Sequence, residues 1–503
     1  MEAVKTSLQS FKELIQKIKS YEEAVSVMYW DLRTGAPKKS VPVRSETIGL
    51  LSTEMFKMSV SDDMGRYLEE LMAPGVFSSL THNDQRMLEE AKKDYDRSKK
   101  IPPELYQEYV ILTSQAESAW EEAKPNNDFK AFQPYLEKII EFQKKFIDLW
   151  GYEGNKYNTL LDMYEPGMTV EKLDQVFGEL RQKLVPLVAA IAKAKQPEGD
   201  FLHKPFPIDK QREFSVFILE QIGYDFQAGR LDVTAHPFMT ALNPGDARVT
   251  TRFDLEDMKY ALFSTIHEGG HALYEQNIDP ELGRTNLGTG TSMGIHESQS
   301  RFWENIVGRS RHFWTKYYGD LQRMFPEQLA GIDLDRFYPA INEVKPSLIR
   351  TESDELTYNL HIMIRYELEK QLINSELNVS DLPKAWNEKY EEYLGITPPS
   401  DTLGVLQDVH WSGGAFGYFP SYSLGNMYAA QMYHTMRKEL PQFDELVEQG
   451  DFAPIRDWLT EHVYRFGKLK TPNEIIREVT GEELNPEYLV QYLEEKYKPL
   501  YQL

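Results

Sequence analysis

The sequence of 503 residues contains no cysteine. This absence excludes disulfide bonds, thiolate metal ligands and a cysteine nucleophile. Histidine is also scarce, with 11 residues, so a metal would depend on a few histidine, aspartate and glutamate side chains. No apolar run is long enough to cross a bilayer, and the mixed charges of the first 25 residues do not form a signal peptide. We therefore expect a cytoplasmic protein with no membrane partner.

Positive charge is in short supply as well. The chain has 56 lysine and arginine residues against 79 aspartate and glutamate residues, which gives a formal net charge of −23. Such a surface repels phosphate backbones, so nucleic acid is not an expected partner. Hydrophobic residues make up 41% of the chain and charged residues 27%, an ordinary mixture for a protein that folds into a packed core.

Apolar residues recur at helical spacing over most of the chain, as in Phe11, Leu14, Ile15 and Ile18. The sequence therefore predicts a mainly α fold, with long helices over residues 2–30, 81–123, 128–150, 170–195, 256–277, 296–325, 355–373 and 418–438. The alternating residues 249–253 predict a short strand, paired with a segment near 229–235. No stretch is long enough to be a flexible linker. We expect one helical domain over 1–503, with an N-terminal helical lobe of about 1–225 and a catalytic portion of about 226–503.

The main chemical signal is the H-E-x-x-H pattern His267-Glu-Gly-Gly-His271, in a segment with helical apolar spacing. Histidines at i and i+4 lie one turn apart on one helical face, so both can bind one metal ion at about 2.0–2.1 Å. Glu268 is rotated by about 100° from His267, which suits a general base acting on a metal-activated water. Because two glycines inside a helix cost stability, Gly269 and Gly270 predict a close approach by other atoms. The alternative is a chance match, which the scarcity of histidine disfavours.

An open catalytic site needs three protein ligands, and the third cannot be cysteine here. The third histidine of the metzincin pattern is absent after His271. A carboxylate on a following helix is the remaining common solution, and we choose Glu297. Asp279 and Glu281 are rivals, but they flank a proline in a turn, where solvated acidic residues are routine. The metal is expected to be a single divalent ion, zinc first and cobalt as the alternative, because both accept histidine and carboxylate ligands.

The neighbours of Glu297 allow further expectations. His296 would point elsewhere on the helix, as a core or hydrogen-bonded histidine. Arg301, one turn after Glu297, is either a partner of that carboxylate or an ordinary surface ion pair. The glycine-rich segment 287–294 lacks phosphate-loop spacing, so we interpret it as a flexible connector near the site.

Further donors follow in residues 404–422. A glycine-flanked loop carries His410, and Tyr418 and Tyr422 come directly after it. Peptide hydrolysis requires stabilisation of the developing oxyanion, and these side chains are suitable donors. The alternative is that the two tyrosines form an aromatic helix start packed into the core.

These residues occur within a set of six motifs, in order over residues 236–411, that resembles the carboxypeptidase Taq family of thermostable metallocarboxypeptidases. The matching segments are His236-Pro-Phe238, Asp246-Ala-Arg248-Val-Thr250, His267 to His271, His296-Glu-Ser-Gln-Ser300, Ile349-Arg350-Thr-Glu-Ser-Asp354, and Gly404 to Trp411. One departure is Ser353, where the family pattern usually has alanine, a small-for-small change.

The resemblance implies a mainly helical peptidase with a deep central groove, similar to angiotensin-converting and neurolysin-like peptidases, and usually a homodimer. It also implies that the enzyme removes single C-terminal residues from peptides with broad specificity, using zinc or cobalt. By the family pattern, Arg248 and Arg350 would recognise the substrate's terminal carboxylate, since a guanidinium meets a carboxylate bidentately. For either arginine a structural salt bridge is the alternative, and Arg350 is favoured. His236 and His410 would line the site as substrate or oxyanion donors.

Overall fold

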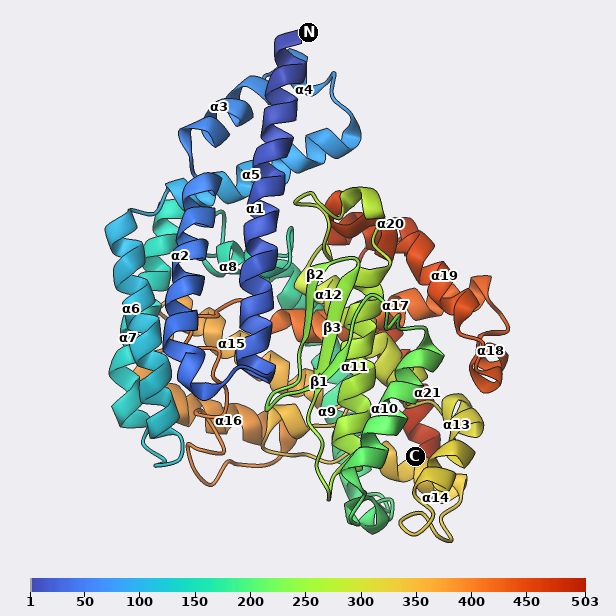
Figure 1. Cartoon of the computed structure of the whole chain (residues 1–503). Coiled ribbons are helices and arrows are strands. Elements are labelled where there is room, and N and C mark those ends of the chain that lie inside the picture. The colour runs from blue at the N-terminus through green and yellow to red at the C-terminus, as the bar shows by residue number, and fades with distance from the viewer. Residues whose placement is uncertain (1) are drawn as a thin grey trace.

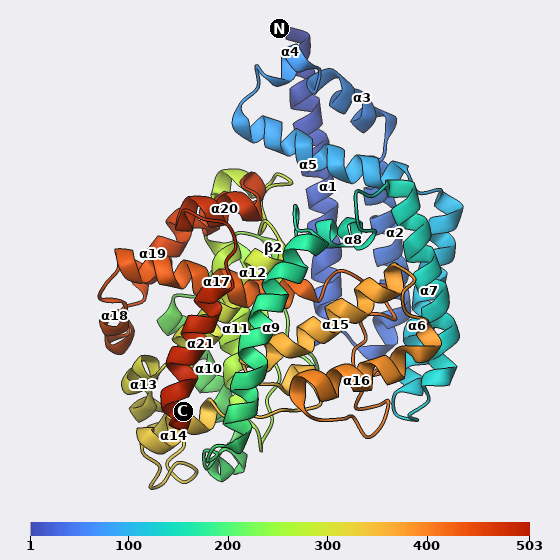
Figure 2. The same ribbon diagram turned by 180° about the vertical axis from the view of Figure 1, so that it is seen from behind.

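The computed structural model describes residues 2–503 and is mainly helical, as the apolar spacing predicts (Figure 1). One small sheet lies beside the helix that carries the H-E-x-x-H pattern. Helices α1 to α7 occupy one side of the molecule and α10 to α14 with α17 to α21 the other, in both views (Figures 1 and 2). No helix within residues 2–503 combines the length and apolarity that a membrane span requires. The predicted lobe boundary near residue 225 and the central groove stay predictions.

The N-terminal part is built from helices that range from 4 to 33 residues in length. They are α1 (Glu2–Thr34), α2 (Val41–Ser59), α3 (Asp62–Leu71), α4 (Pro74–Phe77), α5 (His82–Lys99), α6 (Pro103–Ala123), α7 (Phe129–Trp150), α8 (Tyr157–Tyr164), α9 (Val170–Lys193) and α10 (Ile208–Ile222). The prediction of one helix over 81–123 is wrong. Pro102 and Pro103 separate α5 from α6, because proline lacks a backbone N–H and disfavours helical conformation in the residue before it. The prediction also missed α2, in which only Ile48 is buried, as well as α3, α4, α8 and α10.

The C-terminal part contains α11 (Met258–Gln276), α12 (Met293–Arg301), α13 (Arg311–Met324), α14 (Leu334–Ile341), α15 (Tyr358–Ile373), α16 (Leu382–Leu394), α17 (Pro420–Glu439), α18 (Phe443–Gln449), α19 (Ala453–His462), α20 (Pro472–Thr480) and α21 (Glu487–Tyr501). The expected helix over 296–325 is divided. A π-helical segment, Phe302–Val307, follows α12, and α13 begins only after Ser310 accepts a hydrogen bond from the backbone N–H of Phe313 (3.1 Å). Serine caps compete with helix continuation in this way.

The sheet has the strand order β1-β3-β2. Strand β1 (Leu231–Val233) runs parallel to β3 (Asp246–Thr251), which confirms the predicted pairing. Strand β2 (Met239–Asn243), which the prediction missed, pairs with β3 antiparallel. The inner face of β3 packs on α11, where the hydroxyl groups of Thr251 and Ser264 are hydrogen-bonded at 2.7 Å. The sheet thus braces the helix that carries both histidines.

Helix α12 packs between α11 and α17, and glycines allow both contacts. A Cβ atom on Gly270 of α11 would lie 2.6 Å from the carbonyl oxygen of Gln299 in α12. A Cβ atom on Gly425 of α17 would lie 2.6 Å from Cγ of Glu297. On the other side of α11, a Cβ on Gly269 would lie 2.6 Å from Leu219 of α10. The predicted close approach at Gly269 and Gly270 is therefore confirmed.

Candidate metal centre

His267 and His271 are presented by the middle of α11. This helix begins at a normal cap, since the carboxylate of Asp257 accepts a hydrogen bond from the N–H of Tyr260 (3.0 Å). The two imidazole rings lie 5.0 Å apart between centroids, one helical turn from each other. Burial lowers the pKa of His271 to about 4, so this ring is neutral at neutral pH, the form that binds a metal.

Glu297 of α12 faces both imidazoles. Its Oε2 atom lies 3.6 Å from Nε2 of His267 and 3.3 Å from Nε2 of His271, and the three candidate ligand atoms are all within 4.8 Å of one another. Tetrahedral ligands at about 2.0–2.1 Å from one ion lie about 3.3 Å apart, so this donor set fits zinc or cobalt. Asp279 instead receives the backbone N–H of Glu281 in the turn after α11.

Each imidazole is held at its Nδ1 atom. His267 Nδ1 hydrogen-bonds to Glu304 Oε2 (2.9 Å) in the π-helical segment. His271 Nδ1 hydrogen-bonds to His296 Nδ1 (2.7 Å), and Nε2 of His296 hydrogen-bonds to Glu275 Oε1 (2.8 Å). Such partners fix the tautomer and the orientation of a ligand ring. Both Nε2 atoms are therefore left for a metal, and His296 has the hydrogen-bonded role expected of it.

Neighbouring cationic groups keep the carboxylates of Glu297 and Glu304 ionised. Burial alone would raise the pKa of Glu297, but Arg301 and His267 outweigh it and hold the pKa well below its usual range. Arg301 Nε donates to Glu297 Oε1 at 2.7 Å, and its side chain is only 14% exposed, so Arg301 is a partner of that carboxylate and not an ordinary surface ion pair. Burial likewise opposes ionisation of Glu304, yet His267 and Arg301 lower the pKa of Glu304 to about 2.

Glu268 lies beside the three candidate ligands without joining them. Its side chain is buried, and its carboxylate has no hydrogen-bonded or ion-paired partner within residues 2–503. Burial raises the pKa of Glu268 to about 7. A carboxylate that is enclosed, unpartnered and one residue from a ligand has the placement required of a proton acceptor.

The segment 287–294 packs tightly against this centre. Glu275 accepts hydrogen bonds from the N–H of Gly290 and the hydroxyl of Thr289, both at 2.9 Å. A Cβ atom on Gly290 would lie 2.5 Å from the ring of His296. The glycine at this position therefore allows a close approach between the loop and the histidine that holds His271.

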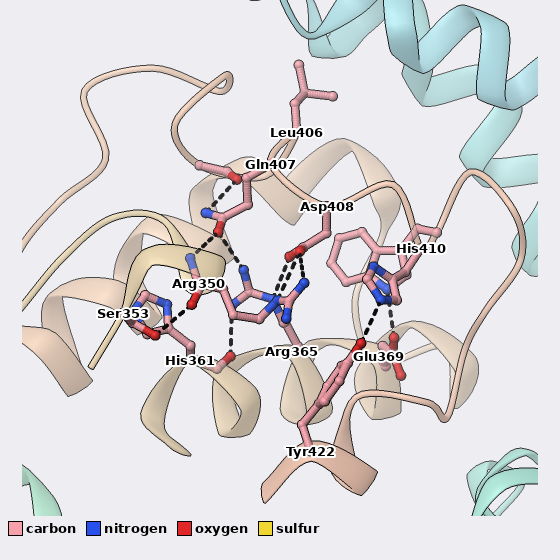
Figure 3. Close-up of polar contacts among 12 residues, drawn as sticks. Arg350, Ser353, His361, Arg365, Glu369, Leu406, Gln407, Asp408, His410 and Tyr422 are labelled. Carbon is pink, nitrogen blue, oxygen red and sulfur yellow. Dashed lines mark hydrogen bonds and ion pairs between the residues drawn. The ribbon is translucent and has the colours of Figure 1, made fainter. Parts of the chain in front are cut away.

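A second polar cluster surrounds Arg350 (Figure 3). Arg350 Nη1 donates to the hydroxyl of Tyr358 (3.1 Å), whose ring lies 4.3 Å from the guanidinium carbon of Arg301. Tyr358 thus connects this cluster to the partner of Glu297. Arg350 Nε and Nη2 both donate to Oδ1 of Asp408, at 3.0 and 2.9 Å.

His410, Tyr418 and Tyr422 gather beside Arg350. His410 Nε2 lies 3.4 Å from the hydroxyl of Tyr422, and the ring of Tyr422 lies 5.2 Å from the guanidinium carbon of Arg350. The rings of Tyr418 and Tyr422 meet edge-on at 5.1 Å. Burial and Arg350 lower the pKa of His410 to about 4, so it is neutral. The three predicted donors are brought together, and all are only partly buried.

His236 and Arg248 lie in the small sheet region. His236 is exposed in the connection between β1 and β2. Arg248 is paired with Asp246 through two hydrogen bonds (2.8 and 2.6 Å) and lies over the ring of Trp30 in α1. No hydrogen bond or ion pair within residues 2–503 links either residue to the metal centre or to the Arg350 cluster. Their roles in substrate recognition stay predictions.

Sequence reasoning missed several supporting residues, among them Arg365 and Glu369 of α15. Both are fully buried, and Glu369 accepts hydrogen bonds from the indole of Trp411 (2.7 Å) and the N–H of Gly417 (2.9 Å). A signal was present, since His361, Arg365 and Glu369 recur every four residues on one face of a helix whose other residues include many apolar side chains. Charged residues on a buried helical face require partners.

Comparisons with known proteins identify the family that this chain matches. The family model of the carboxypeptidase Taq (M32) metallopeptidases matches residues 10–497. The chain is 54% identical to carboxypeptidase 1 of Bacillus subtilis, over 99% of this chain and 100% of the relative. It is 40% identical to thermostable carboxypeptidase 1 of Thermus thermophilus, over 94% of each chain. The crystal structure of the M32 carboxypeptidase from Deinococcus radiodurans superposes with a TM-score of 0.96 at 40% identity, over 99% of this chain and 100% of that one.

Proposed function

Because the chain belongs to the carboxypeptidase Taq (M32) metallopeptidase family and is a metal-dependent carboxypeptidase, we propose that His267, His271 and Glu297 bind its catalytic metal and Glu268 is the general base. The observation that carries this proposal is the spacing of the three ligand atoms, 3.3 and 3.6 Å from the carboxylate oxygen to the two imidazoles. Two histidines from an H-E-x-x-H pattern and a glutamate as third ligand form a ligand set of the kind that binds zinc in peptidases, so we propose zinc as the metal, with cobalt as the alternative.

When bound, a divalent metal of this kind supplies Lewis-acid polarisation of the scissile carbonyl and lowers the pKa of a water. The chain's own residues move the protons. Glu268 accepts a proton from the attacking water and passes it to the leaving amine, so a single carboxylate serves as base and then as acid. His410, with Tyr418 or Tyr422, donates hydrogen bonds to the carbonyl oxygen as negative charge develops on it.

Arg350 gives the enzyme its preference for the chain terminus. Three of its five N–H groups are used by Asp408 and Tyr358, which leaves one N–H on each Nη atom for a carboxylate. A substrate carboxylate bound there would place the last peptide bond beside the metal centre, since only Tyr358 and Arg301 separate Arg350 from Glu297. Arg248 and His236 are further candidates for contacts with the substrate.

Two measurements test this function. The first is mass spectrometry of the products from one peptide and its C-terminally amidated form. We expect stepwise loss of single residues from the free acid and little cleavage of the amide, whereas internal cuts or dipeptide release would point to an oligopeptidase. The second is the Glu268→Gln variant, which should keep its metal while kcat falls by about three orders of magnitude or more. Near-normal turnover would refute the role of Glu268.

We also propose that the protein is a homodimer. Exposed apolar side chains gather on α2 and α6, where Phe56 and Tyr106 are stacked with ring centroids 6.1 Å apart and Val110 and Ile111 are about half exposed. Apolar surface of this kind often marks a subunit interface. Sedimentation of the wild type and of Val110→Glu tests it, because a variant that stays dimeric would exclude this surface. The cytoplasmic location stays an expectation, which cell fractionation tests.

A further inference from the structure

Asp408 lies between two buried arginines, Arg350 and Arg365 (Figure 3). Its Oδ1 atom accepts both hydrogen bonds from Arg350, at 3.0 and 2.9 Å. Its Oδ2 atom accepts one hydrogen bond from Nε of Arg365, at 2.6 Å. The carboxylate therefore does not pair with Arg350 through both oxygens, which is the arrangement that a free guanidinium and carboxylate prefer.

Arg365 is completely buried and cannot reach a substrate. Its remaining donors are all directed at the protein: Nη1 donates to the carbonyl oxygen of His361 and Nη2 to Oε1 of Gln407, both at 2.8 Å. The same Oε1 atom accepts the backbone N–H of Arg350 at 3.0 Å. Arg365 thus fixes both the acid that binds the Arg350 guanidinium and the amide that binds the Arg350 backbone.

The charges of the triad do not cancel, since two guanidinium groups face one carboxylate. His361 and His410 add no charge at neutral pH, because burial lowers the pKa of both rings. The next acid, Glu369, is hydrogen-bonded to Trp411, Gly417 and Tyr157 and to neither arginine, and burial raises its pKa to about 7, so it carries only part of a negative charge at neutral pH. Without Arg365, Arg350 and Asp408 would form a neutral pair. Arg365 therefore leaves the Arg350 site with the positive charge that an anionic ligand requires.

We propose that Arg365 is a positioning residue for the substrate's terminal carboxylate: by holding Oδ2 of Asp408, it keeps Asp408 from closing on Arg350 through both oxygens and from neutralising it. This inference rests on the proposed function, in which Arg350 binds that carboxylate. It assigns to a residue outside all six motifs the task of keeping Arg350 available.

The test compares the wild type with Arg365→Met, with Arg365→Met combined with Asp408→Asn, and with Arg365→Lys. The substrate is one peptide as free acid and as amide. Arg365→Met should raise KM for the free acid by about tenfold or more, with a much smaller fall in kcat, because Asp408 then closes on Arg350. The double variant should recover most of the loss, since asparagine can accept a hydrogen bond from Arg350 without cancelling its charge. Arg365→Lys should be intermediate.

The outcomes separate this role from simple structural support. If Arg365 only supports the fold, the two changes should add, and the double variant should be worse than the single one. That result, or an unchanged KM in Arg365→Met, would overturn the proposal. If Arg365→Met does not fold, the double variant decides, because it removes both buried charges together; a KM tenfold above wild type would then refute the inference. Failure of the proposed function is visible separately, as equal cleavage of acid and amide by the wild type.

Discussion

Gly425 of α17 offers the most direct test of how Glu297, the proposed third metal ligand, is positioned. An alanine methyl group there would lie 2.6 Å from Cγ, 2.7 Å from Cβ and 3.0 Å from the carbonyl carbon of Glu297. Non-bonded carbon atoms prefer about 3.5–4.0 Å, so Gly425→Ala requires a movement of about 1 Å between α17 and α12. The atoms in the way are the backbone and the first side-chain atoms of Glu297, which move less easily than the end of a flexible side chain.

The consequences for stability and for metal binding differ in size. Overpacking typically costs about 1–3 kcal/mol, and alanine returns about 1 kcal/mol of helix propensity. The net destabilisation should therefore be small, about 0–2 kcal/mol. Metal binding tolerates much less movement than folding does, because the distances between a metal and its ligands are defined to about 0.2 Å. We expect the metal affinity of Gly425→Ala to fall by about 10- to 100-fold.

The assay is competition for the metal with a chromophoric chelator, alongside thermal unfolding of the metal-free protein. The control is Gly178→Ala in α9, where a Cβ atom would meet nothing within 4 Å. That variant should gain about 0.5–1 kcal/mol of stability and bind metal like the wild type. The reasoning fails if Gly425→Ala binds metal within twofold of the wild type, because α17 would then not fix Glu297.

Three further predictions concern the supports of the site. Glu275→Gln should weaken metal affinity by about tenfold by loosening His296 and, through it, His271, whereas the exposed Glu281→Gln should not; equal affinities would contradict the hydrogen-bonded chain. A chelator should abolish peptidase activity, and zinc or cobalt should restore it; activity that survives complete metal removal would be incompatible with the site. Burial raises the pKa of Glu165 to about 7 from 4.5, so its folded form binds more protons than the unfolded chain and stability falls as pH rises between these values. Glu165→Gln should remove about 1–3 kcal/mol of that fall in denaturant unfolding between pH 5 and 8, and an unchanged pH slope would exclude it.

The sequence was sufficient for the parts of the site that depend on local spacing. The i,i+4 histidines of α11 and the carboxylate of Glu297 could be proposed as ligands from pattern and elimination, because ligand chemistry restricts the choices to very few residues, and the structure brings their candidate ligand atoms within 4.8 Å of one another. The glycine pair at 269–270 could be interpreted as a close approach, because a helix interior disfavours glycine. The sequence did not show whether a loop, a ligand or another helix approaches these glycines, and only the fold shows that helices α10 and α12 do so.

Other features depend on contacts between distant segments. The tie from Glu165 to the N–H of Gly294 joins residues 129 positions apart. Asp408 and Arg365 likewise form a hydrogen bond although they are 43 positions apart in the sequence, and no local pattern around either residue predicts the other as its partner. At Pro102 and Pro103 the local effect of proline ends one helix and starts another, within a segment predicted as a single helix. The sequence prediction gave too much weight to apolar spacing there.

The packing of α12 against α17 also makes the candidate metal centre depend on a segment far along the sequence. His267, His271 and Glu297 all precede Pro420 in the sequence, and α11 packs on one side of α12, yet the other side of α12 is covered by α17. Tyr428 of α17 also supplies the hydroxyl that holds Glu165 against the start of α12, at 2.8 Å. A nascent chain therefore carries His267, His271 and Glu297 without the support of α17 until residues 420–439 have been made. The order of the helices along the chain therefore means that the packing around Glu297 is finished only after α17 has been synthesised.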